Sequence, residues 1–158
     1  MNITTRTTIM AFRKYQRGAA AVELALILPI LVTLMVFPIF YARCFWHYTV
    51  AQKAAQDAVR YLSQVPRAEM MATSFAASAT NTALAIAQRE MADIAPGLTY
   101  KLRVYCDDMD CGLVPGKAPE TVHVFINFSM VDDIFGVVET GRYGLRITAD
   151  ARMSYVGM

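Results

Sequence analysis

The longest pattern along the chain is a run of uncharged, mostly apolar residues from Leu24 to Ala42. A helix rises about 1.5 Å per residue, so a helix over this run would span about 28 Å, close to the hydrocarbon thickness of a bilayer. The pattern therefore predicts one membrane-spanning helix. Glu23 lies directly before the run, so a carboxylate stands at the N-terminal end of this segment.

The apolar periodicity continues beyond the run in amphipathic form. Three aromatic residues, Phe45, Trp46 and Tyr48, suit a membrane interface. Further apolar positions then recur at helical spacing, with polar residues largely opposite, at Val50, Ala54, Ala58, Leu62 and Val65. The pattern predicts a stalk-like extension of the first helix that ends near Pro66, because proline disfavours helical backbone in the residue before it.

A second helical pattern runs from about Ala68 to Ala95. Its apolar stripe is rich in small residues and consists of Phe75, Ala79, Ala83, Ala87, Met91 and Ile94. Small side chains allow close approach, so we expect this helix to pack against the stalk. Pro96 and Gly97 should end it, because proline cannot continue a helix and glycine favours the turn.

After Gly97 the pattern changes from helical periodicity to alternation. Three runs place apolar residues on one face and polar residues on the other, over residues 98–106, 121–130 and 145–155. Strands with one apolar face need cover, which the two helices can supply. The predicted fold class is therefore α+β, pilin-like in layout: a long N-terminal transmembrane helix extending into an amphipathic stalk, a second helix, and a small three-stranded antiparallel sheet.

Charge is distributed unevenly and predicts the topology. Four of the 15 Lys and Arg residues, Arg6, Arg13, Lys14 and Arg17, precede the apolar run, and no acidic residue accompanies them. By the positive-inside rule the N-terminus stays cytoplasmic and the chain from Arg43 onward crosses to the periplasm of a bacterial inner membrane. Because the excess positive charge is confined to this leader, we expect no nucleic-acid partner.

The three cysteines fit an extracytoplasmic location. Cys106 and Cys111 could pair across "CDDMDC", and Cys44 would then remain free or join two subunits. A zinc site would need more ligands than these residues offer. The same loop holds Asp107, Asp108 and Asp110, but it lacks the glycine and the distant glutamate of an EF-hand, so we expect no metal.

Several kinds of membrane segment compete for the apolar run. A cleaved secretory signal would be shorter and end at a small-residue cleavage site, whereas this run ends in "FYARCFW". A lipoprotein site at Cys44 would need a small residue where Arg43 stands. An uncleaved signal anchor explains the segment except for Gly18 and Glu23. An acidic residue within a spanning helix costs about 2.5 to 3.5 kcal/mol at the centre, and less near the end, where Glu23 lies.

The short basic leader, Gly18, "AAAV", Glu23 and the apolar helix together resemble the processing site of type IV prepilins. More narrowly, residues 17–63 resemble the N-terminal region of TadE-like proteins, the minor pilin-like components of Flp/Tad pilus systems. This resemblance implies that a membrane prepilin peptidase cuts between Gly18 and Ala19. It also implies other pilins or pseudopilins and the Tad assembly machinery as partners. The family commonly has an aromatic residue after the glutamate, where this chain has Leu24.

The spacing of the motif has a physical reading. Cleavage would create an ammonium at Ala19, and Glu23 lies about one helical turn further on, within reach of its own N-terminus or a neighbour's. In assembled pilins such a pairing would set axial register more than it adds stability. Glycine at position 18 should help stop the helix and present extended backbone to the peptidase.

These observations divide the chain into a basic prepilin-type leader (1–18), a transmembrane helix (19–45) and a periplasmic α+β domain (46–158). The two histidines, His47 and His123, stand beside no nucleophile, glycine motif or metal-ligand spacing, so we expect no enzymatic activity and no cofactor. The main hypothesis is a minor pilin-like protein for pilus assembly that is cut after Gly18 and enters the fibre or stays in the membrane. The alternative is an uncleaved single-pass protein whose periplasmic domain binds a partner.

Overall fold

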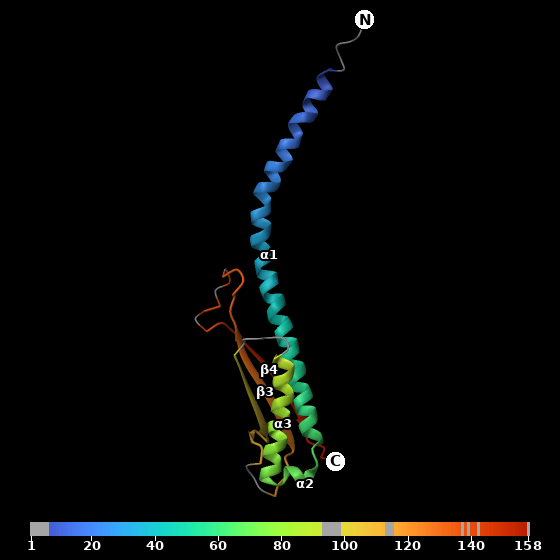
Figure 1. Cartoon of the computed structure of the whole chain (residues 1–158), viewed down its shortest axis with the longest axis vertical. Helices are drawn as coiled ribbons and strands as arrows, with labels where there is room; N and C mark the ends of the chain where they lie inside the picture. The colour runs from blue at the N-terminus through green and yellow to red at the C-terminus, as the bar shows by residue number, and fades with distance from the viewer. Residues whose placement is uncertain are drawn as a thin grey trace. The chain divides into compact units, whose positions relative to one another are not determined.

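The structure is a computed structural model that describes residues 7–92, 99–112, 116–136, 138, 140–141 and 143–157, with side chains from Gly18 onward. The chain forms two compact units, Met1–Phe40 and Tyr41–Met158. The first helix, α1, spans Thr7–Gln64 and contributes to both (Figure 1). We describe each unit by itself.

The described part of the first unit is a continuous stretch of α1 on which most apolar side chains are exposed, whereas those of Val36 and Phe40 are buried. Pro29 and Pro38 lie inside the helix, where each removes one main-chain donor. The hydroxyl of Thr33 donates to the carbonyl of Pro29 at 2.8 Å. Among the described residues, one helix, over Gly18–Gln64, is long and apolar enough to cross a membrane, in agreement with the predicted spanning segment.

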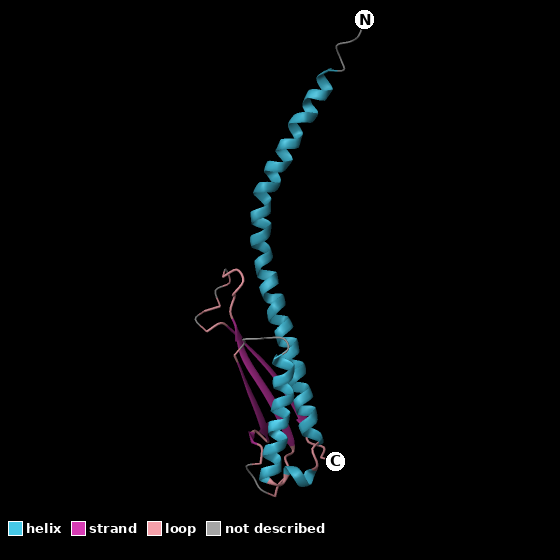
Figure 2. Ribbon diagram, viewed as in Figure 1, coloured by secondary structure: helices cyan, strands magenta, loops and turns pink. Residues whose placement is uncertain are grey.

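The second unit combines the rest of α1 with two further helices and a sheet (Figure 2). Helix α2 spans Arg67–Met70 and α3 spans Thr73–Ala92. The strands are β1 (Tyr100–Cys106), β2 (Met109–Asp110), β3 (Thr121–Met130) and β4 (Leu145–Ser154), in the spatial order β2-β1-β3-β4 with every pair antiparallel. The α+β class and the antiparallel sheet were predicted from the sequence.

The predicted number of strands was wrong, because the sheet has four. The additional strand, β2, lies inside the segment that was expected to be an exposed loop, and it pairs Tyr105 with Asp110 and Cys106 with Met109. A two-residue turn makes this possible: Asp107 and Asp108 have φ of 51° and 63°. Aspartate tolerates this left-handed conformation better than most side chains do, which lets the chain reverse tightly.

The alternation along the strands places one face of the sheet in the core. The strand β3 buries every second residue, and its neighbours do the same over part of their length, β1 toward its end and β4 near its middle. Helices α1 and α3 lie along this face (Figure 1). The buried positions on the strands are Val104, Cys106, Val122, Val124, Ile126, Phe128, Met130, Ala149 and Ala151.

Small residues line the helices where they meet the core. Those of α1 include Ala51, Ala54, Ala55 and Ala58, and those of α3 are Ala76, Ala79, Ala83 and Ala87 with Met91. Because these side chains are small, the two helices pack closely. The Lys53 Nζ atom of α1 lies 3.6 Å from Glu90 Oε2 of α3. Phe75, which was expected in the buried stripe, is instead 61% exposed, and the neighbouring Ala76 is buried. Ile94, also in the predicted stripe, lies outside the described residues.

The second predicted helix is interrupted near its start, and the last residues of its predicted range, 93–95, lie outside the described residues. Pro66 precedes α2, and the chain turns at Met71 and Ala72 before α3 begins. The carbonyl of Met71 accepts a hydrogen bond from the N–H of Gly116 at 3.0 Å, so a helix end is satisfied by the connection between β2 and β3. The interruption buries Met70 under that connection.

Candidate functional site

The predicted processing and assembly site lies on α1. Its three residues, Gly18, Ala19 and Glu23, are all exposed. A Cβ built on Gly18 would meet no atom within 4 Å. The bond between Gly18 and Ala19, which the sequence predicts to be cut, therefore has open space beside Gly18 among the described residues. Of the ion pairs between described residues, none involves Glu23.

The backbone at Gly18 differs from the expectation. We expected glycine to stop the helix, but α1 runs through Gly18 without interruption. The following residues, Ala19 to Ala21, are the strongest helix formers, and a single glycine costs only about 1 kcal/mol within a helix. A peptidase that binds extended backbone would therefore have to unwind about one turn here, and glycine lowers the cost of doing so.

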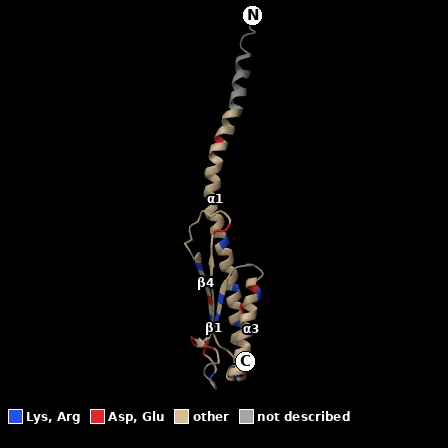
Figure 3. Cartoon of the chain, turned by 60° about the vertical axis from the view of Figure 1, so that its left-hand side comes forward, with Lys and Arg blue, Asp and Glu red and all other residues tan. Residues whose placement is uncertain are grey.

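Helical geometry sets what Ala19 and Glu23 can do together. Four residues correspond to about 6 Å along the axis, and side chains so spaced share one face of the helix. A free amino group at Ala19 would lie within reach of the Glu23 carboxylate. The other exposed side chains of this stretch are mostly apolar, and Figure 3 shows how little charge the described part of the first unit carries compared with the second unit. Two opposite charges on an apolar helix attract each other more strongly where the surroundings, such as a bilayer, exclude water.

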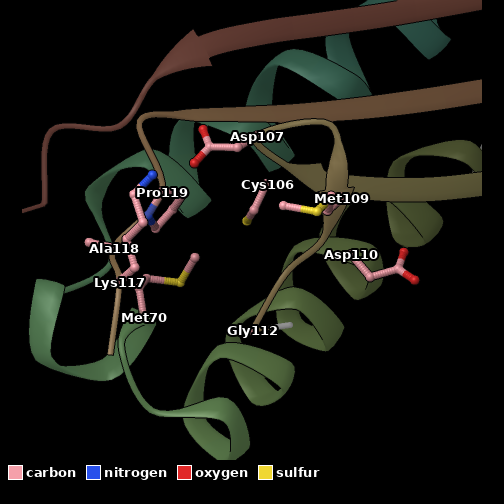
Figure 4. A pocket seen from close by; sticks show the side chains of 9 residues that line it. All are labelled: Met70, Cys106, Asp107, Met109, Asp110, Gly112, Lys117, Ala118 and Pro119. Carbon is pink, nitrogen blue, oxygen red and sulfur yellow. The ribbon is translucent and has the colours of Figure 1, made fainter. Parts of the chain in front are cut away.

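The structure joins the two cysteines that the sequence predicted to pair. The Cα atoms of Cys106 and Cys111 lie 4.8 Å apart and the sulfur atoms form a disulfide. The bridge closes the β1–β2 hairpin, next to a small cavity of about 90 Å³ lined by Met70, Cys106, Asp107, Met109, Asp110, Gly112, Lys117, Ala118 and Pro119 (Figure 4). Cys44 is a free cysteine and is buried.

Asp107 and Asp108 of this loop form hydrogen bonds and an ion pair that stabilise the hairpin. Asp107 accepts hydrogen bonds from the N–H groups of Thr121 at 2.8 Å and Glu120 at 2.9 Å, and Asp108 pairs with Arg152 at 2.6 Å. Desolvation raises the pKa of Asp107, but the hydrogen bonds from these two main-chain donors outweigh it, and the pKa lies below its ordinary value. Among the described residues no three metal-ligating side chains lie together.

The two histidines lie in different environments. His47 is half-buried on α1, and burial lowers its pKa. His123 stands on the sheet face opposite the helices, with its Nε2 atom 3.4 Å from Asp150 Oδ2 and its ring 6.3 Å from that of Tyr105. The absence of enzymatic activity stays a prediction.

Sequence reasoning missed a second set of residues around the end of the apolar run. Arg43 forms an ion pair with Asp133 at 3.0 Å, although the two are 90 positions apart. Beside this pair, α1 and the start of β4 enclose an apolar groove of about 330 Å³ lined by Tyr41, Cys44, Phe45, Tyr48, Leu145 and Ile147. The alternating pattern of β4 predicted an apolar face, but no local signal indicated which part of α1 would meet it.

The fold and the exposed helix define a class of protein: an N-terminal apolar helix of membrane-anchor type that continues into a small α+β domain. Residues 18–60 match the family model described as TadE-like protein. The match begins at Gly18, includes Glu23 and ends in the part of α1 that packs on the sheet, so the resemblance predicted from the sequence is confirmed over this stretch. No significant match was found among curated proteins or among solved structures.

Proposed function

We propose that this chain is a minor pilin-like, or pseudopilin, component that acts in assembly of a Flp/Tad-type type IVb pilus. The observation that carries the proposal is the placement of Gly18, Ala19 and Glu23 on one exposed, otherwise apolar helix within the TadE-like stretch. The partners would be a prepilin peptidase, other pilins or pseudopilins and the Tad assembly machinery. Its role would be structural, with no catalytic step and no cofactor.

Topology follows from charge and redox chemistry. The four basic residues before Gly18 favour a cytoplasmic N-terminus, which sends the domain from residue 46 onward into the periplasm. A disulfide between Cys106 and Cys111 supports this orientation, because disulfides form and persist in oxidising compartments. The protein would be anchored in the inner membrane by residues 19–45.

Processing would change the electrostatics of the helix end. In the precursor, Glu23 is a carboxylate at the entrance of an apolar segment, which is unfavourable for insertion. After the bond between Gly18 and Ala19 is cut, the new ammonium at Ala19 offers a partner one turn away, or on an adjacent subunit. A pair formed between subunits would fix how far one helix is displaced along the next.

The test is intact-mass measurement and N-terminal sequencing of the membrane-isolated protein, produced with an active or an inactive prepilin peptidase. We expect the wild-type chain to begin at Ala19 only with the active peptidase. Gly18→Val should remain uncut, because it places a β-branched side chain at the bond where glycine presents none to the peptidase. The matched control Ala20→Val, which leaves Gly18 in place, should be cut. A wild-type chain that still begins at Met1 with active peptidase would favour the uncleaved single-pass alternative.

A further inference from the structure

The connection between β3 and β4 presents apolar side chains to the surroundings. Ile134 is 55% exposed, Phe135 is 44% exposed and Tyr143 is 82% exposed, and Val131 is also exposed. We name Val131, Ile134, Phe135 and Tyr143 the loop patch. A cluster of exposed apolar residues in one connection is unfavourable in water and marks a contact surface.

Two carboxylates of the same connection have hydrogen-bond partners within the protein. Asp132 accepts hydrogen bonds from the N–H groups of Phe135 and Val138, both at 3.1 Å. Asp133 accepts a hydrogen bond from Arg43 at 3.0 Å. The side chain of Asp133 is still 65% exposed, but its charge and that of Asp132 both have partners within the protein, which lowers the cost of bringing the loop patch into contact with an apolar phase.

The ion pair with Asp133 fixes where along α1 this connection lies. Arg43 is the first charged residue after the uncharged run, and the aromatic residues Phe45, Trp46 and Tyr48 follow it, all of them exposed. A spanning helix leaves the bilayer at such a boundary, where aromatic and basic side chains prefer the headgroup region. The connection is thus held beside the point at which α1 would emerge from the membrane.

The apolar groove between α1 and β4 continues the surface. Tyr41, Phe45 and Tyr48 contribute one wall, and Leu145 and Ile147, which directly follow the connection, contribute the other. The groove has a volume of about 330 Å³, and none of the described residues that line it is charged. Its lining suits a hydrocarbon segment rather than a polar ligand.

We propose that the loop patch and this groove form a second contact with the bilayer that α1 spans, with the patch seated at the boundary between headgroups and acyl chains. The domain would then be held against the membrane surface instead of extending freely on its stalk. This inference rests on the membrane anchoring in the proposed function, but not on cleavage or on pilus assembly. Lipid is the occupant that the surface fits, because the patch adjoins the end of an apolar run of helix and the described carboxylates beside it are partnered within the protein.

The experiment uses the full-length chain in phosphatidylcholine vesicles with or without bromine on the acyl chains, which quench nearby indoles. Trp46 is the single tryptophan, so the variants W46F/F135W and W46F/I134W each report on the loop patch alone. The matched control is W46F/F75W, because Phe75 is an exposed phenylalanine on α3 of the same unit. We expect brominated lipid to quench both loop reporters severalfold more than the control, and aqueous acrylamide to quench the control more.

Two outcomes would overturn the proposal. Loop reporters that acrylamide quenches as strongly as the control would show that the patch faces water. Loop reporters shielded from both quenchers would show that a protein, either a second copy or another subunit, covers the patch. The wild-type protein tests membrane anchoring separately from the loop-patch proposal. Quenching of Trp46 by brominated lipid supports the spanning helix, whatever the loop reporters show.

Discussion

The phenol of Tyr155 donates a hydrogen bond to the main-chain carbonyl of Val65 at 2.6 Å. The bond joins the residue just after β4 to the residue just after α1. Two further main-chain bonds lie beside it, from the N–H groups of Val156 and Gly157 to the carbonyl of Ser63, at 3.0 and 3.2 Å. The C-terminal segment therefore satisfies carbonyls at the end of α1 that no further helical turn could satisfy.

Replacing Tyr155 by phenylalanine should destabilise the domain by about 1 kcal/mol, because the Val65 carbonyl loses its partner. Burial raises the pKa of Tyr155 above its ordinary value of 10.0. The folded state therefore favours the protonated phenol, so its contribution is complete below pH 10.0 and declines as pH rises through the raised pKa. Urea unfolding of wild-type and Y155F protein in nanodiscs should show a stability difference that narrows above this pH. A difference independent of alkaline pH would contradict the role of the phenol proton.

Two glycines with the same backbone conformation offer a matched pair. Gly112 has φ of 81° and Gly116 has φ of 79°. A Cβ at Gly112 would lie 3.1 Å from the Cβ of Ala76 and 3.3 Å from the carbonyl oxygen of Thr73, whereas a Cβ at Gly116 would meet nothing within 4 Å. Gly116→Ala should cost about 1 kcal/mol from backbone strain alone. Gly112→Ala should cost about 1 to 3 kcal/mol more, because α3 must shift to make room for the added Cβ. Equal losses of unfolding free energy for the two variants, measured by urea unfolding, would refute this close packing.

The small residues of α3 also make a quantitative prediction. Ala83 is fully buried, whereas Ala85 is exposed on the same helix. Ala83→Leu should destabilise the domain by about 1 to 3 kcal/mol through overpacking. Ala85→Leu should change stability by less than about 0.5 kcal/mol, because its side chain enters solvent. Thermal unfolding of both variants in the same detergent checks this, and tolerance of leucine at position 83 would mean that α3 is not closely packed there.

Asp107 predicts a dependence on acidic pH. Its pKa lies below the ordinary value of 3.8 because hydrogen bonds from main-chain donors outweigh desolvation. The carboxylate therefore contributes stability above the unfolded-state pKa, and this contribution is lost as pH falls through the lower, folded-state pKa. Asp107→Asn should lower stability near neutral pH by about 1 to 2 kcal/mol, and the difference from wild type should shrink below pH 3.8. A constant difference across this range would show that the charge does not matter.

The parts of this fold that follow from periodicity were predictable. Alternation alone assigned Val122, Val124 and Ile126 to the buried face of β3, because side chains along a strand point to opposite faces in turn. Strand β2 was not predictable, since two residues cannot show a period and its turn depends on left-handed aspartates. Phe75 was misassigned because hydrophobicity alone does not reveal that Gly112 requires the smaller Ala76 at the contact.

The candidate site divides in the same way. Gly18 and Glu23 belong to a local motif, so their spacing could be read directly from the sequence. The pair of Arg43 and Asp133 could not, because contact between residues so far apart is decided by how β4 packs on α1. The exposed state of Ile134 and Phe135 depends on the same packing, because an apolar residue in a connection can lie either in the core or at a surface.

Glu23 gives the most direct test of why the spanning helix carries an acidic residue. Glu23→Gln keeps the size of the side chain and removes the charge, so insertion should be unimpaired and cleavage after Gly18 should persist. If a pair between Glu23 and the new ammonium sets helix register, the affinity for other pilus subunits should fall about tenfold or more. A tenfold loss of affinity corresponds to about 1.4 kcal/mol of binding free energy. Glu69→Gln, at an exposed position on α2, is the matched control and should behave as wild type. Intact mass reports on cleavage, and co-purification with the other subunits reports on assembly. If Glu23→Gln is cleaved normally and its association and pilus formation are undiminished, Glu23 does not set helix register and merely lies in the headgroup region. A charge that sets register could not be removed without weakening association.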